Sequence, residues 1–593
     1  MHNLFNRHKD RIKIYSILIG MVLLYMLVKG YSFYASDPYE YVPSIQKFID
    51  NDYLKNDWFL NTQTGFNVRT YFYYLISFFL PVLSIKSTFL LLFIVNTFFL
   101  VLGIFYISQL LFKDRLSSYL SCFLVLFSVW KLIGDFAIIA PFFTPSHISI
   151  TLSIWALFFF LRKRYNIMFL MLGLSTFLHL LIGISALILL STVILVRDRF
   201  SSIKIFAVGS VFYSPALLSI IPLLLIEFSQ RSSASEVILT FAWIRIPWHL
   251  IPSQFSLISY ISFSILTLLF LYSLRDAGKS KMNHDIYLML ICAAIYFFLG
   301  YLLVEVFPIE LAMKLQFFRM IILVRIILLI YIANHFSKSF ASSPSVLLAI
   351  TLASLFDHIL IVIVPFYLIY ELFIKKKFAG YTSTMSYACL ASIGLTFFAF
   401  ILFGKNFISS EFFRRIFSDY LWIFFILAVY YIHTLRKMKI YKLVIPSVAI
   451  AFCILSIAVI AQFKSLEPEK DNMYSWIRQN TPDDSVFLIP PYLEDFRVKA
   501  MRAIVVDFKS MPFQSDQMIE WRNRLSDITS NIEFRSAINR KNELKVGFES
   551  LTKEDIARLQ DKYGFQYILI EKPMRLQQKS IYENAKYALY STS

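Results

Sequence analysis

Residues 14–34 read IYSILIGMVLLYMLVKGYSFY, and residues 35–41 continue the chain as ASDPYEY. The first stretch is long and apolar enough to cross a lipid bilayer as one helix. Asp37 and Glu40 follow directly, where that helix leaves the hydrocarbon. Because a carboxylate at this depth is costly unless it is well hydrated or has a function, the junction indicates an active site at the membrane surface.

The composition of the whole chain predicts a polytopic membrane protein. Its 593 residues are 58% hydrophobic and only 16% charged, whereas soluble domains carry about 25% charged residues. The formal net charge is +19, but Lys+Arg equals Asp+Glu within residues 465–593, so the surplus lies in residues 1–464. Much of that surplus occupies short loops, where it sets topology, so we do not expect nucleic acid as a partner.

Basic clusters in these loops determine the predicted topology. They lie at residues 7–13, 113–115, 162–164, 197–199, 275–281, 375–377 and 436–442. The positive-inside rule places every cluster in the cytoplasm, provided that the apolar residues 70–83 lie in the outer interface and do not cross. The N-terminus is then cytoplasmic and the C-terminal tail is periplasmic or extracellular. The predicted spans are 14–34, 87–112, 116–134, 148–162, 165–178, 181–197, 203–226, 255–274, 286–306, 317–335, 345–357, 359–374, 382–404, 418–436 and 442–463.

The predicted fold class is therefore a polytopic α-helical membrane protein of about 13–15 spans with a small C-terminal α/β outer domain. The transmembrane domain covers residues 1–464 with a first outer loop at 35–86, and the periplasmic α/β domain covers 465–593. Thr552 and Gly564 are the predicted caps of one tail helix. In the tail, β-branched runs predict strands at 486–489, 503–506 and 567–570, and helical patterns lie at 471–479, 516–525 and 553–563.

Two acidic residues of the outer loops are candidate catalytic groups. Asp37 lies at a suitable height to take a proton from an acceptor or to bind a divalent cation. The alternative is that Asp37-Pro38 caps the following helix, since Asp suits the N-cap and Pro the first helical position. Asp135, at the outer end of the third predicted span, is the second candidate, with a solvated loop carboxylate as its alternative. Asp57 is expected to have a structural role in its loop.

Cations of the outer segments are candidate ligands of a phosphate. Arg binds phosphate oxygens bidentately, and His adds a hydrogen bond or a charge. Residues 245–252, which read RIPWHLIP, combine Arg245 and His249 with two prolines. Their alternative role is an interfacial anchor of the kind that Trp and Arg provide at membrane surfaces. The predicted substrate-binding residues are Arg69, Arg245, His249, Lys314 and Arg319.

This pattern resembles the GT-C superfamily of membrane glycosyltransferases. The resemblance implies that an acidic residue just after the first helix acts on a polyprenyl-phosphate sugar, a position that Asp37 matches, and that Asp135 matches a second outer-loop acid. Residues 476–487 and 562–570 resemble the start and the closing step of the outer domain of such proteins. Pro490-Pro491, Phe496-Arg497, Lys509, Pro512 and Glu520-Trp521 resemble a poorly characterised bacterial family with the same layout.

From this resemblance we expect an inverting glycosyltransferase in the inner (cytoplasmic) membrane of a bacterium. Its partners would be a lipid-linked sugar donor and a glycan, lipid or protein acceptor. The chain has Asp37-Pro38 where some members have an adjacent Asp-Glu pair, so the cofactor is unknown and a divalent cation is one candidate. The alternative function is a transporter or flippase for a lipid-linked glycan, which would show repeated halves and midplane charges. A membrane scaffold with an inactive site is a third alternative.

Overall fold

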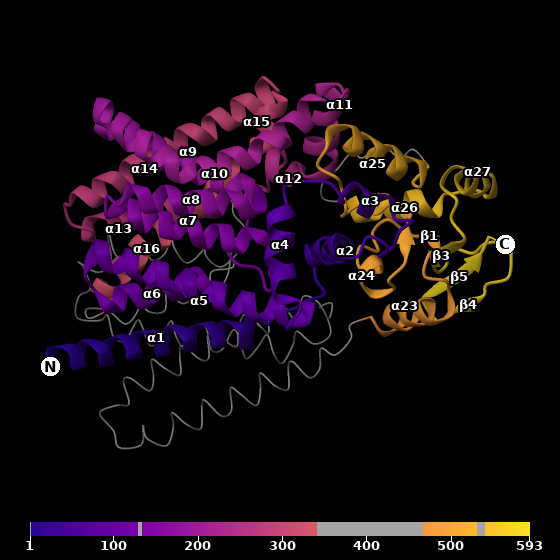
Figure 1. Ribbon diagram of the computed structural model, residues 1–593, viewed down its shortest axis with the longest axis horizontal. Helices are drawn as coiled ribbons and strands as arrows, with labels where there is room; N and C mark the ends of the chain where they lie inside the picture. The colour runs from indigo at the N-terminus through magenta and orange to yellow at the C-terminus, as the bar shows by residue number, and fades with distance from the viewer. Residues whose placement is uncertain (1, 128–132, 341–466, 531–539, 593) are drawn as a thin grey trace, which may run out of the picture.

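The computed structural model describes residues 2–127, 133–340, 467–530 and 540–592. A helical bundle and a smaller domain that contains a sheet follow each other along the longest axis (Figure 1). We call the second body, residues 467–530 and 540–592, the tail domain. The long bundle helices are α1 (His2–Lys29), α5 (Ile85–Phe112), α6 (Arg115–Phe127), α7 (Pro145–Leu161), α8 (Tyr165–Leu178), α9 (Leu180–Asp198), α10 (Ser202–Phe228), α13 (Leu257–Ser273), α14 (Lys281–Tyr301) and α16 (Ile321–Phe340).

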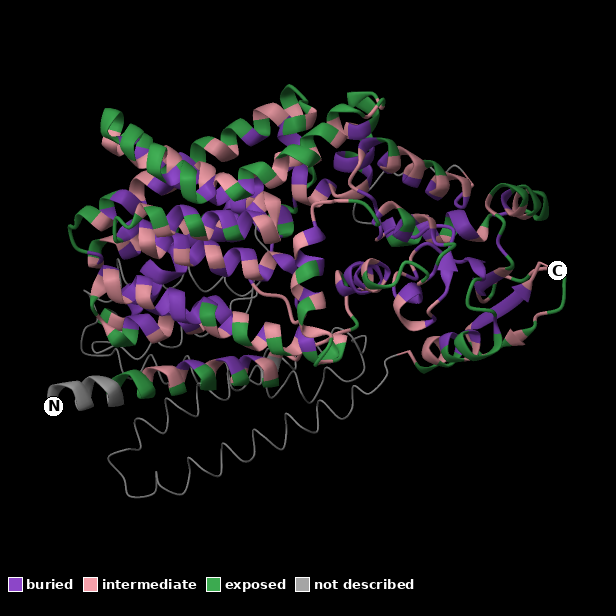
Figure 2. Cartoon of the chain, viewed as in Figure 1, coloured by how far each residue is buried: buried purple, intermediate pink, exposed green. Residues whose placement is uncertain are grey.

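The bundle confirms the predicted multi-pass membrane protein. Large apolar side chains on α10 and α14 stay exposed, for example Val211 at 68% and Phe298 at 61%. Figure 2 shows exposed residues along the upper edge of the bundle. Contiguous apolar surface of this kind suits contact with lipid. The predicted spans 345–357, 359–374, 382–404, 418–436 and 442–463, and the boundary at 464, lie outside the described residues. Within the described residues, five segments are long and apolar enough to cross a membrane: Ile85–Phe112, Leu180–Phe228, Leu257–Asp276, Lys281–Val306 and Glu310–Lys338.

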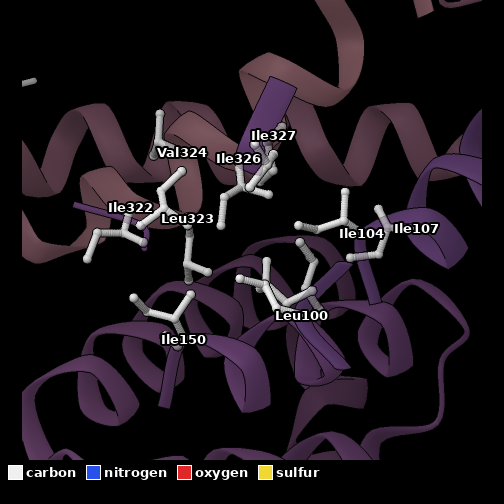
Figure 3. Close-up of a cluster of buried hydrophobic side chains, with 14 of the residues drawn as sticks. Leu100, Ile104, Ile107, Ile150, Ile322, Leu323, Val324, Ile326 and Ile327 are labelled. Atoms are coloured by element: carbon white, nitrogen blue, oxygen red, sulfur yellow. The ribbon is translucent and has the colours of Figure 1, made fainter. Parts of the chain in front are cut away.

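Helix α16 is the central element of the bundle. Its run IILVRIILLIYIA is apolar on nearly all sides, which is the pattern of a helix surrounded by other helices. Figure 3 shows Ile322, Leu323 and Ile326 of α16 together with Leu100 of α5 and Ile150 of α7 in one buried cluster. The packing of α16 against α5, α6 and α7 holds the first half of the bundle together.

The apolar residues 70–83 form a helix that is too short to cross the bilayer. Helix α4 (Thr70–Phe79) has 10 residues, about 15 Å of length against the ~30 Å of a hydrocarbon core. In Figure 1 it runs across the ends of the long bundle helices, next to the tail domain. Phe78 is 77% and Val82 86% exposed. This placement fits the prediction that the segment lies along an interface.

The tail domain is built on a five-stranded mixed sheet in the order β2-β1-β3-β5-β4. The parallel strands β1 (Val486–Leu488), β2 (Ala503–Ile504) and β3 (Tyr567–Glu571) confirm the predicted ones, and β5 (Tyr587–Ser591) and β4 (Tyr582–Glu583) add an antiparallel edge. The predicted capping residues of α27 (Lys553–Tyr563) are also confirmed, with Thr552 in a capping box and Gly564 left-handed. The other tail helices are α23 (Pro468–Asn480), α24 (Phe496–Lys499), α25 (Ser515–Asp527) and α26 (Arg540–Glu549).

A buried ion network fastens the first loop, residues 35–86, to the tail domain. Asp57 caps α3 (Trp58–Thr62) with one carboxylate oxygen, and the other accepts from Arg497 Nε at 2.7 Å and from the Ile504 amide at 3.1 Å. Arg497 also pairs with Asp507, and these charged side chains are 0–2% exposed. Asp57 therefore has the structural role expected from the sequence. We call Asp57, Arg497 and Asp507 the closed joint.

Candidate functional site

The carboxylate of Asp37 does not cap the helix that follows it. Asp37 occupies the N-cap position of α2 (Pro38–Ile49), but its side chain makes no capping hydrogen bond. Instead, Asp37 Oδ1 accepts from the Nζ of Lys509 in the tail domain at 2.5 Å. The two side chains are 38% and 16% exposed, respectively, so the pair is open to a ligand. We call Asp37 and Lys509 the open joint, since it is a second link between the first loop and the tail.

Three cations surround the Asp37 carboxylate. Burial raises the pKa of Asp37, but Lys509, and then Arg69 and Arg245, outweigh burial and lower that pKa to about 2. The group is therefore ionised at any physiological pH. Figure 1 places α2 and α4 at the end of the bundle that faces the tail domain, and the contact of Asp37 with Lys509 joins the two bodies there.

Arg69 is a cation whose charge is already compensated. Its Nη1 donates to Glu40 Oε1 at 2.6 Å, and the residue is 9% exposed. The guanidinium lies over the rings of Tyr41 and of Phe513 from the tail domain, 4.6 Å from each centroid. These contacts give Arg69 a structural role between loop and tail, while its charge still acts on Asp37.

Arg245 and Arg319 differ from Arg69 because neither has a carboxylate partner among the described residues. Arg245, which ends η3 (Leu239–Arg245), donates through Nη2 to the Lys509 carbonyl at 2.8 Å. Arg319 of η7 (Phe317–Met320) donates through Nε to Gln316 Oε1 at 2.5 Å and lies over the ring of Phe136 at 5.1 Å. Both guanidinium groups thus keep donors for an anion.

The ring of His249 is exposed to the charges of both arginines and is neutral. It belongs to α12 (Pro247–Leu250), stacks on Phe136 at 4.7 Å, and its Nδ1 is hydrogen-bonded to the Gly134 carbonyl. Because a carbonyl only accepts, Nδ1 carries the proton and Nε2 keeps a free lone pair. Burial lowers the pKa of His249, the Gly134 contact opposes this, and Arg319 and Arg245 lower it further, to about 3. His249 can therefore offer a hydrogen-bond acceptor and not a charge.

The structure places Asp135 and Lys314 away from these contacts. Asp135 ends η1 (Ile133–Asp135) with a φ of 50°, and its side chain is exposed, whereas its neighbours Gly134 and Phe136 hold the His249 ring. Lys314, in α15 (Glu310–Leu315), donates to Glu227, to Glu310 at 2.6 Å and to Ser515 at 2.9 Å. All three of its donors are thus used between loops and tail domain.

Sequence reasoning missed two groups that lie near Asp37. Lys509 stood out only through the resemblance of the tail, with no chemistry assigned. His147 accepts through Nε2 from the Ala140 amide at 2.9 Å, and its buried Nδ1 has no partner among the described residues. Burial lowers the pKa of His147 to about 4 against the opposing charge of Asp37. The signal for His147 was its position in Pro145-Ser146-His147, next to the loop of Asp135.

The donor set around Asp37 does not fit a divalent cation. Among the described residues, no group of three or more His, Cys, Asp or Glu side chains could hold a metal ion. Hard divalent cations need several oxygen ligands, whereas the charged neighbours that act on Asp37 are Lys509, Arg69 and Arg245. We therefore derive no step through a metal.

A mostly apolar cavity of about 540 Å³ is lined by Phe318, the neighbour of Arg319 in the chain. Its lining includes Ile133, one residue before Gly134, and Phe318, one residue before Arg319. Pro252, Phe255 and Phe297 contribute further apolar walls. A cavity of this size and lining suits a hydrocarbon chain whose polar end reaches the arginines.

The multi-pass helical bundle with its small α/β domain has a fold similar to that of solved structures of ArnT. ArnT from Cupriavidus metallidurans in the apo state is 10% identical and has a TM-score of 0.52, over 99% of this chain and 98% of ArnT. ArnT bound to undecaprenyl phosphate is 11% identical and has a TM-score of 0.51, over 98% of each chain.

Weaker or shorter similarities accompany these matches. The oligosaccharyltransferase of Archaeoglobus fulgidus is 13% identical and has a TM-score of 0.46, over 94% of this chain and 69% of its own. Residues 469–528 match a family model described as Domain of unknown function (DUF6798). Comparison with curated protein sequences finds no match. At these identities the similarity to the two ArnT structures shows the fold.

Proposed function

We propose that this chain transfers a sugar from a polyprenyl-phosphate donor to an acceptor at the outer face of the membrane. The observation that carries the proposal is the ionised Asp37 under the charges of Lys509, Arg69 and Arg245. Arg245 and Arg319, whose charge also interacts with Asp37, have no carboxylate partner among the described residues, and Phe318 next to Arg319 lines a mostly apolar cavity. A phosphate attached to a lipid chain has the matching chemistry. The fold shared with ArnT, which was solved with undecaprenyl phosphate, supports the same donor class.

In this mechanism Arg245 and Arg319 bind the phosphate of the donor, and the cavity lined by Phe318 holds the start of its lipid chain. The acceptor hydroxyl or amine attacks the anomeric carbon and gives its proton to the Asp37 carboxylate. The bond between that carbon and the phosphate oxygen breaks, and its electron pair leaves with the phosphate. Two guanidinium groups aimed at the leaving oxygen stabilise the charge that develops there.

A single displacement of this kind inverts the configuration at the anomeric carbon. The acceptor, held by Asp37, attacks from the face opposite the phosphate, so we propose an inverting enzyme. His249 would accept a hydrogen bond through Nε2 from a hydroxyl of the sugar or of the acceptor. The basic clusters of the bundle loops favour an orientation in a bacterial inner membrane with Asp37 and the tail domain outside the cytoplasm.

The test compares surface glycans and lipid-linked sugars by mass spectrometry in cells that lack the gene. Complementation uses wild type, Asp37→Asn or the control Asp484→Asn, whose carboxylate is an exposed partner of Lys55. We expect wild type and the control to restore a missing sugar and Asp37→Asn to leave it missing. Full restoration by Asp37→Asn would reject the transferase mechanism and favour a transporter of lipid-linked glycans.

A further inference from the structure

Lys509 is anchored by its backbone but not by its side chain. The Phe508 amide donates to the Pro491 carbonyl at 2.9 Å, Arg245 donates to the Lys509 carbonyl at 2.8 Å, and Trp521 Nε1 donates to the Asp507 carbonyl at 2.9 Å. The ammonium instead contacts Asp37 at 2.5 Å and the Ser36 hydroxyl at 3.4 Å. A flexible four-carbon stem on a fixed backbone lets this point charge change partners.

The charges that face the open joint come from several elements. Asp37 belongs to the first loop, and Glu494 belongs to the tail domain. Burial raises the pKa of Glu494, and the charge of Lys509 opposes this. No ion-pair partner of Glu494 is found among the described residues. The other titratable or charged groups near the joint are Arg69 of α4, Arg245 of η3, Arg319 of η7, His147 of α7, His179 before α9, His249 of α12, Tyr41 of α2 and Asp507 of the closed joint.

We propose that Lys509 is a ligand of the donor phosphate as well as the partner of Asp37, and that its ammonium passes from the carboxylate to the phosphate when the donor binds. This inference rests on the proposed function and assigns the tail domain a direct part in the site. It also makes the tail domain more than a cover, because the cation that controls Asp37 comes from a residue 472 positions away in the chain.

Movement of the Lys509 ammonium from Asp37 to the phosphate resolves a chemical conflict within the site. A carboxylate held in an ion pair, with its pKa lowered to about 2, is a poor proton acceptor at neutral pH. When the ammonium moves to the phosphate, Asp37 regains basicity just when an acceptor can be activated. The same cation then stabilises the second negative charge that the phosphate gains as its bond to the sugar breaks. One lysine thus couples donor binding to activation of the base.

A binding experiment on the full-length protein in lipid nanodiscs tests this inference without requiring turnover. The probe is undecaprenyl phosphate, and undecaprenol is the lipid control. We expect Lys509→Met to weaken binding of the phosphate by about tenfold, because a charge-assisted hydrogen bond is lost, and Lys509→Arg to bind more tightly than Lys509→Met. Asp37→Asn should bind at least as tightly as wild type, since Lys509 is released.

The matched control is Lys562→Met, which removes another tail lysine from an ion pair, here with Asp527 at 2.7 Å. The closed joint should keep the tail docked in both methionine variants, and their melting curves verify folding. Wild-type affinity for undecaprenyl phosphate in folded Lys509→Met would overturn the inference, as would equal losses for undecaprenyl phosphate and undecaprenol.

A pH profile separates the inference from the proposed function. If sugar transfer is found, removal of Lys509 should raise the pKa of Asp37 in the donor-free enzyme, so the acid limb of kcat/KM, which reports that state, moves to higher pH. A lysine with a merely structural role would lower the rate equally at every pH. Phosphate binding that depends on Lys509 without any sugar transfer would reject the proposed function and leave Lys509 as a phosphate ligand.

Discussion

The closed joint and the open joint connect the same first loop to the same tail domain, yet they differ in burial and in partners. Asp57 and Arg497 are 0% and 2% exposed, and Asp57 accepts hydrogen bonds from the protein through both carboxylate oxygens. Asp37 is 38% exposed, and Lys509 holds it through one oxygen. A buried carboxylate that is bonded through both oxygens serves architecture, whereas an exposed one with a spare oxygen among cations serves a ligand.

The largest expected effect comes from a substitution that breaks the open joint. Asp37→Asn keeps the size of the side chain but removes the proton acceptor, so sugar transfer should fall by about 10²–10⁴-fold. An assay with purified full-length protein and a polyprenyl-phosphate sugar measures it. The melting temperature should change little, since the closed joint remains. A variant that loses its rate and its melting transition together would show that Asp37 is structural after all.

Breaking the closed joint should instead lower the stability of the protein and leave the chemistry of the site intact. Arg497→Met leaves Asp57 and Asp507 buried without their cation, and a loss of about 3–5 kcal/mol in the free energy of unfolding is expected. Differential scanning fluorimetry, or protease sensitivity of the tail domain, measures that loss. Any fall in the rate of sugar transfer should match the fraction of molecules whose tail domain has undocked from the bundle. A stable Arg497→Met protein with no activity would contradict the structural role assigned to this network.

Much of the fold followed from the sequence, because hydropathy and loop charge are local signals. The same holds for α27, whose capping residues Thr552 and Gly564 flank it directly. Strand β5 escaped prediction, since Tyr587–Ser591 mixes apolar and polar residues and depends on pairing with β3. The role of Lys509 in the open joint was not predicted for the same reason. Asp37 could be recognised at the end of a predicted span, but Lys509 is 472 residues away and contacts it only through tertiary packing.

Substitution of Arg319, one of the two arginines without a carboxylate partner among the described residues, should have a smaller effect, on the affinity for the donor phosphate. Arg319→Gln should weaken binding of undecaprenyl phosphate by about tenfold, because a charge-assisted contact to the phosphate is removed. Arg231→Gln, at an exposed loop cation, is the control and should bind as wild type does. Isothermal titration calorimetry in nanodiscs distinguishes the two. Equal affinity in both variants would exclude Arg319 from the phosphate site.

Lys314 should contribute to stability and not to phosphate binding, as the closed joint does, although the sequence predicts it as a phosphate ligand. Its ammonium already serves Glu227, Glu310 and Ser515. Lys314→Met should therefore cost at most about 1 kcal/mol of stability, as expected for a partly exposed ion pair, and leave the affinity for undecaprenyl phosphate unchanged. A loss of affinity as large as that of Arg319→Gln would return Lys314 to the binding site.

The smallest expected effect concerns the neutral ring of His249, on which the charges of Arg319 and Arg245 act. Its pKa in the folded protein is lowered to about 3, whereas an unfolded histidine titrates near pH 6.5. The folded state thus binds the proton less well, so this group's contribution to stability is full above about pH 6.5 and declines as pH falls toward 3. His249→Asn keeps a donor for the Gly134 carbonyl but cannot titrate. Between pH 7 and pH 5 the melting temperature of wild type should therefore fall more than that of His249→Asn. Parallel curves would mean that the ring titrates alike in the folded and unfolded states, and His249 would then carry a charge for the phosphate below about pH 6.5.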